Sequence, residues 1–126
     1  MVQHPLFVYG TLMSDQRAFP RLAPAVTRSV RATLPDAQIF AVSWYPVAVP
    51  GAGEVHGEVH WLAPGAYAAV LADLDAYEGD EYVRAVRTVT TAAGQPLDAW
   101  VYLGATTPAH GLTPITHGDW RRFHGR

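Results

Sequence analysis

LDAYEGDEYVR, residues 74–84, is the stretch of this sequence that decides the fold, because it joins a helical pattern to a strand pattern. In the residues leading into it, apolar side chains recur at the three-and-four spacing of an amphipathic helix, which predicts a helix over about residues 66–77. The apolar positions are Tyr67, Val70, Leu71 and Leu74. Gly79 is a natural residue for such a helix to end at.

Glu78 lies on the same apolar stripe, four residues after Leu74 and seven after Leu71. The pattern therefore predicts that the last helical turn aims a carboxylate at the interior. Burial and the negative end of a helix both disfavour the charged form, so both raise the pKa of this glutamate. A raised pKa suits general acid–base catalysis near neutral pH. The neighbouring Asp80 and Glu81 are expected to lie in solvent.

The rest of the chain is cut into short segments by ten prolines and eleven glycines. A short helix is expected over residues 15–22, with Ser14 as its cap. One or two helical turns near residues 118–123, with Trp120, Arg121 and Arg122, should pack onto the sheet. Surface ion pairs are an equally good interpretation of the two arginines. Alternation and β-branched residues predict strands over residues 6–9, 26–34, 37–42 and 54–62, and a hairpin of residues 83–91 and 97–103. Residues 45–51 are expected to be extended and bounded by turn formers. These elements predict one α+β domain, residues 1–126, around a curled or closed sheet.

Composition excludes several classes of function. The 126 residues have a formal charge of −2 and no basic cluster, so a nucleic-acid partner is not expected. The absence of cysteine excludes thiolate nucleophiles and cysteine metal sites, and the absence of lysine excludes Schiff-base chemistry. No signal-peptide pattern is present, and no apolar run reaches the ~20 residues of a membrane span. A cytoplasmic protein without a membrane partner is expected.

The second informative element is Tyr9-Gly10-Thr11-Leu12, directly after the first predicted strand. A strand that runs into a glycine and a hydroxyl residue makes a turn whose backbone N–H groups can point at an anion or a carbonyl oxygen. Plain turn chemistry is the alternative interpretation of this element when it is taken alone.

Five short motifs occur in a fixed order: Tyr9-Gly10-Thr11-Leu12, Tyr45-Pro46, Gly57-Glu58-Val59, Glu78-Gly79 followed by Tyr82 and Arg84, and Gly118-Asp119-Trp120-Arg121. In this order the chain resembles the γ-glutamylcyclotransferase-like family, in its small bacterial γ-glutamylamine cyclotransferase-like branch. The resemblance covers almost the whole chain, from Phe7 to Phe123.

The resemblance implies a small mixed β-barrel with flanking helices and a cavity at its mouth. It implies that the loop Tyr9 to Leu12, with Gly10 and Thr11, binds the amino acid end of a γ-glutamyl group, and that Glu78 is the acid–base residue. The implied reaction releases 5-oxoproline and a free amine from a γ-glutamyl amine or γ-glutamyl amino acid, and it needs neither metal nor cofactor. The implied partner is this small-molecule substrate, and we expect a monomer or a weak homodimer.

Three more residues are candidates for the substrate cavity. Tyr82 and Arg84 are two apart on a predicted strand and so share a face. Tyr102 follows Trp100 at strand spacing and would offer a hydroxyl. For Tyr82 and Arg84, a structural tyrosine and a salt-bridging arginine are equally good interpretations.

A metal site is a competing hypothesis, because His56 and His60 are four residues apart in His56-Gly57-Glu58-Val59-His60. This is not the His-Glu-x-x-His order of zinc proteases, and it lies in a strand pattern. Both histidines, with Glu54 and Glu58, are expected on the outer polar face of the strand. A metal hydrolase and a non-catalytic small-molecule binding domain therefore remain as alternatives to the cyclotransferase.

Overall fold

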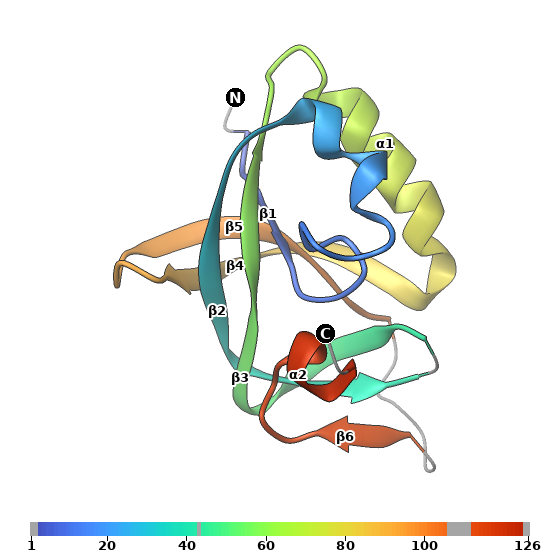
Figure 1. The fold of residues 1–126 in the computed structure, drawn as a ribbon, viewed down its shortest axis with the longest axis vertical. Coiled ribbons are helices and arrows are strands. Elements are labelled where there is room, and N and C mark those ends of the chain that lie inside the picture. Colours follow the sequence, from blue (N-terminus) through green and yellow to red (C-terminus); the bar gives the residue numbers. More distant parts are fainter. Residues whose placement is uncertain (1–2, 43, 106–111, 125–126) are drawn as a thin grey trace.

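Strands close into a barrel in the computed structural model, which describes residues 3–42, 44–105 and 112–124 (Figure 1). The order around the barrel is β3-β1-β5-β4-β2, and β2 pairs with β3 to complete the ring. A short strand, β6, extends the sheet beyond β2. The strands are β1 (Leu6–Val8), β2 (Val26–Ala41), β3 (Pro46–Leu62), β4 (Tyr82–Thr91), β5 (Pro96–Gly104) and β6 (Thr113–Ile115). The predicted α+β fold with a mixed barrel is confirmed.

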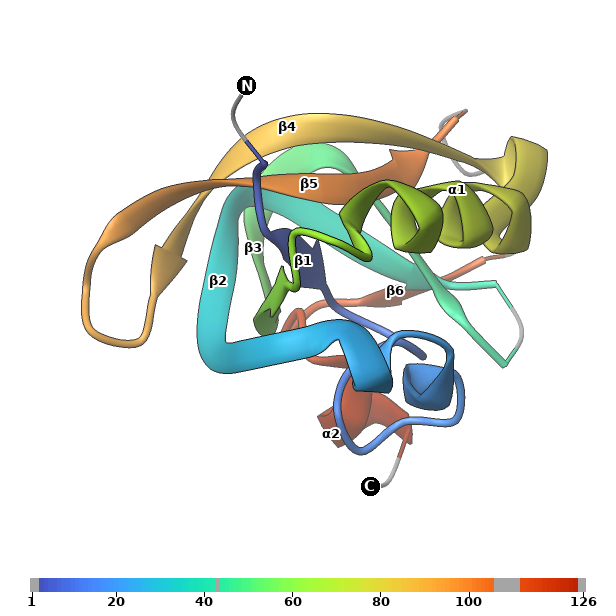
Figure 2. The same cartoon turned by 90° about the horizontal axis from the view of Figure 1, so that it is seen from above.

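The main helix lies outside the barrel beside the 3-10 turns that follow the first loop (Figures 1 and 2). It is α1, Tyr67–Glu78, and it buries Leu71 and Leu74 as predicted. Gly79 ends it with a φ of 67°, a conformation that favours glycine, and its N–H donates to the Asp75 carbonyl. The shorter helical elements are η1 (Phe19–Arg21), η2 (Ala23–Ala25), η3 (Gly79–Glu81) and α2 (Trp120–His124).

The two longest strands each join segments that the sequence pattern separates. β2 continues through the predicted break near residue 35, where its register against β3 shifts and Asp36 adopts a φ of 56°. Such a bulge bends a strand without ending it, which lets one strand serve two sides of a barrel. β3 likewise runs from Pro46 to Leu62 through its glycines.

The predicted helix over residues 15–22 is wrong. Turns and the 3-10 elements η1 and η2 occupy this region, and Pro20 and Pro24 lie in their first turns. Proline interrupts the hydrogen bonding of a longer helix. Ser14 does not cap a helix, because its N–H and its hydroxyl both donate to the carboxylate of Glu58, at 2.7 and 2.9 Å.

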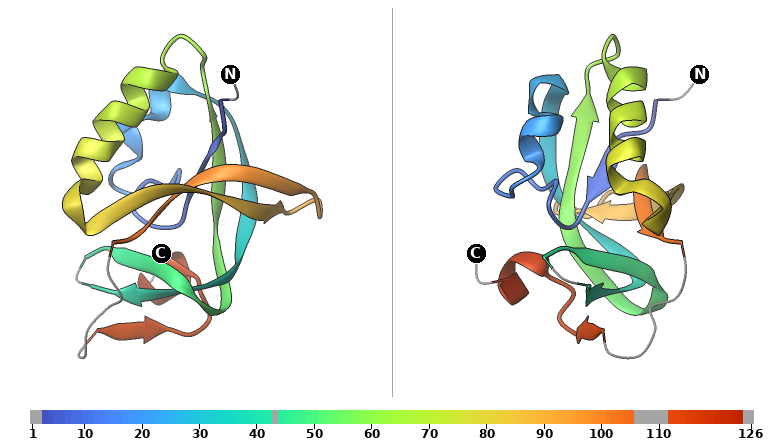
Figure 3. Two further views of the ribbon diagram at one scale, coloured as in Figure 1. Left: turned by 180° about the vertical axis from the view of Figure 1, so that it is seen from behind. Right: turned by 90° about the vertical axis from the view of Figure 1, so that its right-hand side faces the viewer.

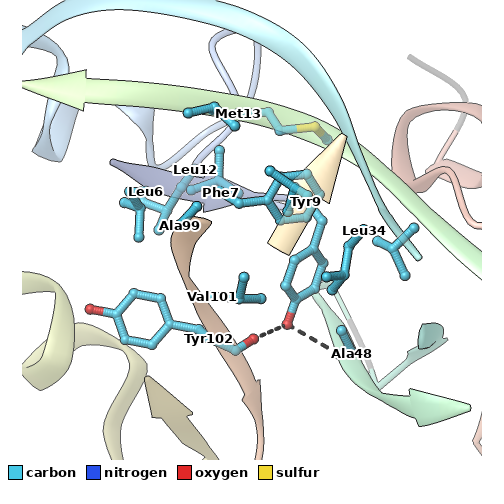
Figure 4. Close-up of a cluster of buried hydrophobic side chains, with 14 of the residues drawn as sticks. Leu6, Phe7, Tyr9, Leu12, Met13, Leu34, Ala48, Ala99, Val101 and Tyr102 are labelled. Carbon is cyan, nitrogen blue, oxygen red and sulfur yellow. Dashed lines mark hydrogen bonds between the residues drawn. The ribbon is translucent and has the colours of Figure 1, made fainter. Parts of the chain in front are cut away.

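The core fills the barrel and the space under α1, and Tyr9 brings a hydroxyl into it (Figure 4). The Tyr9 hydroxyl donates to the Tyr102 carbonyl at 2.6 Å and accepts from the Ala48 N–H at 3.1 Å. Tyr9 is therefore a structural residue that ties the exit of β1 to β5 and β3. In the described part of the chain, no helix is long and apolar enough to cross a membrane.

We expect Tyr9→Phe to lower the free energy of unfolding by about 1–3 kcal/mol, because it leaves a buried N–H and a buried carbonyl without their partner. Chemical denaturation measures this. Tyr45→Phe is the matched control, since its hydroxyl bonds Glu81 in an exposed position, and it should cost much less. Equal losses of unfolding free energy in the two variants would contradict the structural role of the Tyr9 hydroxyl.

Candidate active site

A cleft opens where β1 ends, between the loop that follows it, the start of β3 and the end of α1. It encloses about 300 Å³ of empty space, including its mouth. Its lining includes Glu78 from α1, Tyr82 from β4 and Pro46 from β3. The remaining lining residues are Phe7, Val8, Tyr9, Gly10, Thr11, Leu12 and Tyr102. The barrel thus brings together the loop, the glutamate and two of the three further residues predicted for the cavity.

The loop at the cleft presents backbone donors. Within residues 3–42, 44–105 and 112–124, the N–H groups of Gly10, Thr11 and Leu12 donate to no protein acceptor. The loop is nevertheless ordered, because Met13 N–H donates to the Gly10 carbonyl at 3.1 Å and Ala18 N–H to the Thr11 carbonyl at 2.9 Å. A fixed turn with unused N–H groups is suited to hold a carboxylate or a developing oxyanion.

Gly10 is required by close approach to β3. A Cβ at this position would lie 2.7 Å from two ring carbons of Pro46, closer than non-bonded carbons tolerate. The loop and the start of β3 therefore pack without an intervening side chain, and the cleft stays narrow. Only glycine permits this packing.

Glu78 is half-buried in the cleft, and its carboxylate has no hydrogen-bond or ion-pair partner among the described residues. Burial, the larger cause, and the negative charge of Glu81 together raise its pKa from 4.5 to about 7. The sequence predicted burial as one cause. The other comes from Glu81, which was expected only as a solvated residue.

Glu81 is exposed, but it is also part of the site. Its carboxylate accepts a hydrogen bond of 2.7 Å from the hydroxyl of Tyr45, and both residues line a second hollow that shares Glu78 and Tyr82 with the cleft. η3 keeps this second carboxylate near Glu78 immediately after the helix ends. A like charge so close disfavours ionisation of Glu78.

The tyrosines of the cleft are committed to protein partners. Tyr82 donates its hydroxyl to the Pro46 carbonyl at 2.7 Å, and Tyr102 donates to the Asp75 carboxylate at 2.7 Å. Burial raises the pKa of both hydroxyls above the ordinary value, so both stay neutral. Thr11 lies 3.4 Å from the hydroxyl of Tyr77, a residue of α1. These tyrosines shape the cleft, and Glu78 is the lining residue whose pKa is raised to about 7.

Arg84 does not join the residues that line the cleft. Its guanidinium pairs with Asp75 at 2.8 Å and lies over the ring of Trp100, 4.2 Å from its centroid. It thereby fixes Asp75, which in turn accepts from Tyr102. Arg84 is therefore a salt-bridging residue, one of its two expected roles, although it shares a strand face with Tyr82.

The predicted outer face for Glu58 and His60 is wrong, because the loop after β1 covers that part of β3. Glu58 is 8% exposed and His60 is fully buried, whereas His56 and Glu54 remain exposed. The ring nitrogens of His60 lie 2.6 Å from the Ser29 hydroxyl and 3.3 Å from the Leu12 carbonyl. His56 and His60 therefore do not face a common site. In the described ranges, no group of three histidine, cysteine, aspartate or glutamate residues is placed to hold a metal.

Comparisons with known proteins identify the family of the chain. The family described as "Gamma-glutamyl cyclotransferase, AIG2-like" matches residues 6–122, and the chain belongs to this family. The Escherichia coli K12 protein YtfP, named a gamma-glutamylcyclotransferase family protein, is 36% identical over 117 residues, which cover 91% of this chain and 94% of YtfP.

Solved structures show the same fold. The solution structure of E. coli ytfP has a TM-score of 0.64 at 34% identity and covers 92% of this chain and 95% of its own. The crystal structure of an AIG2-like protein from Mus musculus has a TM-score of 0.73 at 22% identity and covers 93% of this chain and 87% of its own. The barrel is thus common to bacterial and animal proteins.

We expect Glu78→Gln to stabilise the protein at pH 8 by about 1–3 kcal/mol. A carboxylate whose pKa is raised on folding binds more protons in the native state, so stability is lost as pH rises from about 4.5 through 7. Glutamine removes that loss. Unfolding midpoints of both proteins at pH 5 and pH 8 measure this difference in stability. The stability gained by Glu78→Gln should shrink at pH 5. A variant less stable than wild type at pH 8 would contradict the burial of an ionised carboxylate at this position.

Proposed function

We propose that this protein cyclises a γ-glutamyl amine or γ-glutamyl amino acid to 5-oxoproline and a free amine, with Glu78 as general acid–base residue. The observation that carries the proposal is a partnerless glutamate with a pKa of about 7 in a cleft next to unused backbone N–H groups. Family membership supports the same class of reaction.

The substrate supplies its own nucleophile in this reaction. Its α-amine attacks its own γ-carbonyl carbon, a five-membered ring closes, and the bond from that carbon to the leaving nitrogen breaks. The protein has to hold the chain folded so that the two groups meet, which removes much of the entropic cost of the step. The loop N–H groups would bind the α-carboxylate or the oxyanion of the tetrahedral intermediate.

Glu78 moves the protons. The attacking nitrogen starts as an ammonium and ends as an amide N–H, so it loses two protons. The leaving nitrogen starts as an amide N–H and ends as an ammonium, so it gains two. A carboxylate with a pKa near 7 is ionised often enough to accept these protons and acidic enough to return them. The balance of the reaction requires no external oxidant, reductant or water.

The purified protein should release 5-oxoproline from at least one member of a panel of γ-glutamyl amino acids and γ-glutamyl amines, and Glu78→Gln should lower this rate at least about a hundredfold. Chromatographic detection of 5-oxoproline measures both. Glu78→Gln folds around the same cleft, so a loss of rate with ligand binding retained isolates the chemical step. Turnover that survives in Glu78→Gln rejects this mechanism, and binding without product across the panel favours the non-catalytic binding domain.

The pH dependence of turnover tests the environment of Glu78. We expect kcat/KM to rise with pH through a midpoint near 7, because the ionised glutamate accepts the first proton. Glu81→Gln should move the midpoint to lower pH, since it removes a charge that raises the pKa of Glu78. Burial, the larger cause, remains in this variant, so the midpoint should stay above 4.5.

Asp80→Asn is the matched control for this experiment. It removes an exposed carboxylate from the same turn, η3, and does not alter the charge that acts on Glu78. Its pH profile should overlay the wild-type profile. A midpoint that moves equally in Asp80→Asn and Glu81→Gln would mean that general surface charge controls Glu78.

A further inference from the structure

Next to the loop lies a buried carboxylate that does not line the cleft and that the proposed reaction does not use. Glu58 sits on β3 opposite Val8, the last residue of β1, so it stands where the loop begins. Its Oε1 and Oε2 accept from the N–H and hydroxyl of Ser14, the last residue of the loop of residues 10–14. Glu58 thus holds the far end of the loop.

Arg121 completes this contact from the other end of the chain. Its Nη2 donates to Glu58 at 2.7 Å, and its Nε donates to Asp15 at 2.7 Å, one residue beyond Ser14. Its side chain is 20% exposed, so this ion pair is partly buried, whereas a surface ion pair was one of the two interpretations of its sequence. Figures 2 and 3 show α2 next to the loop that follows β1.

His60 adds a third contact to the same loop. Because the Leu12 carbonyl can only accept, Nε2 of His60 is the donor in the 3.3 Å contact, and Nδ1 then accepts from the Ser29 hydroxyl. Burial lowers the pKa of His60, so the ring stays neutral and keeps this arrangement. Leu12 and Ser14 are therefore both held by side chains of β3, whereas the N–H groups of residues 10–12 donate to no acceptor among the described residues.

We propose that Glu58 and Arg121 are positioning residues for substrate binding, which clamp the loop of residues 10–14 so that its N–H groups keep a binding geometry. This inference rests on the proposed function of the loop. Neither residue lines the cleft, so neither contacts substrate and both act through the loop. The last helix of the chain, α2, is thereby a functional part of the site.

The electrostatics of Glu58 are consistent with a clamp. Burial alone would raise its pKa, but the hydrogen bonds from Ser14 and Arg121, with the positive charge of Arg121, outweigh burial and hold the pKa below the ordinary value. The carboxylate is therefore charged at neutral pH and accepts all three donors. Removing Arg121 would leave a buried charge poorly compensated, which disturbs the loop rather than only the surface.

The test compares Arg121→Gln, Arg121→Lys and Glu58→Gln with Arg122→Gln. Arg122→Gln removes the same charge from the adjacent, exposed position of α2 and is the matched control. We expect Arg121→Gln and Glu58→Gln to raise KM about tenfold, because a misplaced loop loses binding geometry. In these two variants the pH midpoint of turnover should equal that of wild type, because Glu78 is unchanged. Arg122→Gln should match wild type in both KM and pH midpoint.

Arg121→Lys should recover part of the affinity, because it restores the charge but cannot bridge both carboxylates with a planar fork. All assays are run well below the unfolding midpoint of each variant. Wild-type KM in folded Arg121→Gln and Glu58→Gln overturns the proposal, even if their stability is lowered. Equal KM increases in Arg121→Gln and Arg122→Gln also overturn it.

Amide hydrogen exchange of residues 10–14 gives a readout that needs no turnover. Exchange should be faster in Arg121→Gln than in Arg122→Gln if Arg121 orders the loop, and equal rates overturn the proposal. This measurement tests the clamp independently of the proposed cyclisation. If the wild-type protein forms no 5-oxoproline but exchange is still faster in Arg121→Gln than in Arg122→Gln, the proposed function is refuted and the clamp remains supported.

Discussion

The double pairing of β1 is the constraint on which the site depends. β1 is antiparallel to β3 along one edge and parallel to β5 along the other, so the three-residue strand has no freedom to slide or tilt. The chain leaves the barrel at Tyr9, whose hydroxyl is bonded to β5 and β3 as well. The loop with the unused N–H groups therefore starts from a rigid point. Preorganised donors of this kind need little rearrangement when a substrate arrives.

Two glutamates in this protein show how environment assigns different roles to one side chain. Glu78 is half-buried without a partner, and burial with the neighbouring charge of Glu81 raises its pKa to about 7. Glu58 is more deeply buried, but Ser14 and Arg121 donate to it and its pKa is lowered. The partnerless carboxylate can exchange protons near neutral pH, and the partnered one remains charged and structural. Glu58 contacts the loop that follows β1, and Glu78 lines the cleft beside that loop.

Local patterns predicted the elements whose hydrogen bonds are local. The helix α1, its end at Gly79 and the β4–β5 hairpin follow from periodicity and turn residues, and the resemblance supplied the barrel. The helix expected over residues 15–22 does not form because Pro20 and Pro24 interrupt helical hydrogen bonding in this region, and Ser14, its expected cap, instead donates to Glu58, which is distant in sequence. The alternation of β3 did not reveal that its polar face would be covered by the loop, which buries His60. Arg84 pairs with Asp75 across a helix–strand contact that strand spacing cannot show.

The sequence by itself determined that one carboxylate lies on the apolar stripe at the end of a helix, because helical spacing alone places Glu78 there. It also determined that a glycine turn follows the first strand. Only the tertiary structure decided that these two features share a cleft and that Glu58 and Arg121 contact each other and the end of the loop. Those contacts join residues that are far apart along the chain, and barrel closure is the physical event that brings them together.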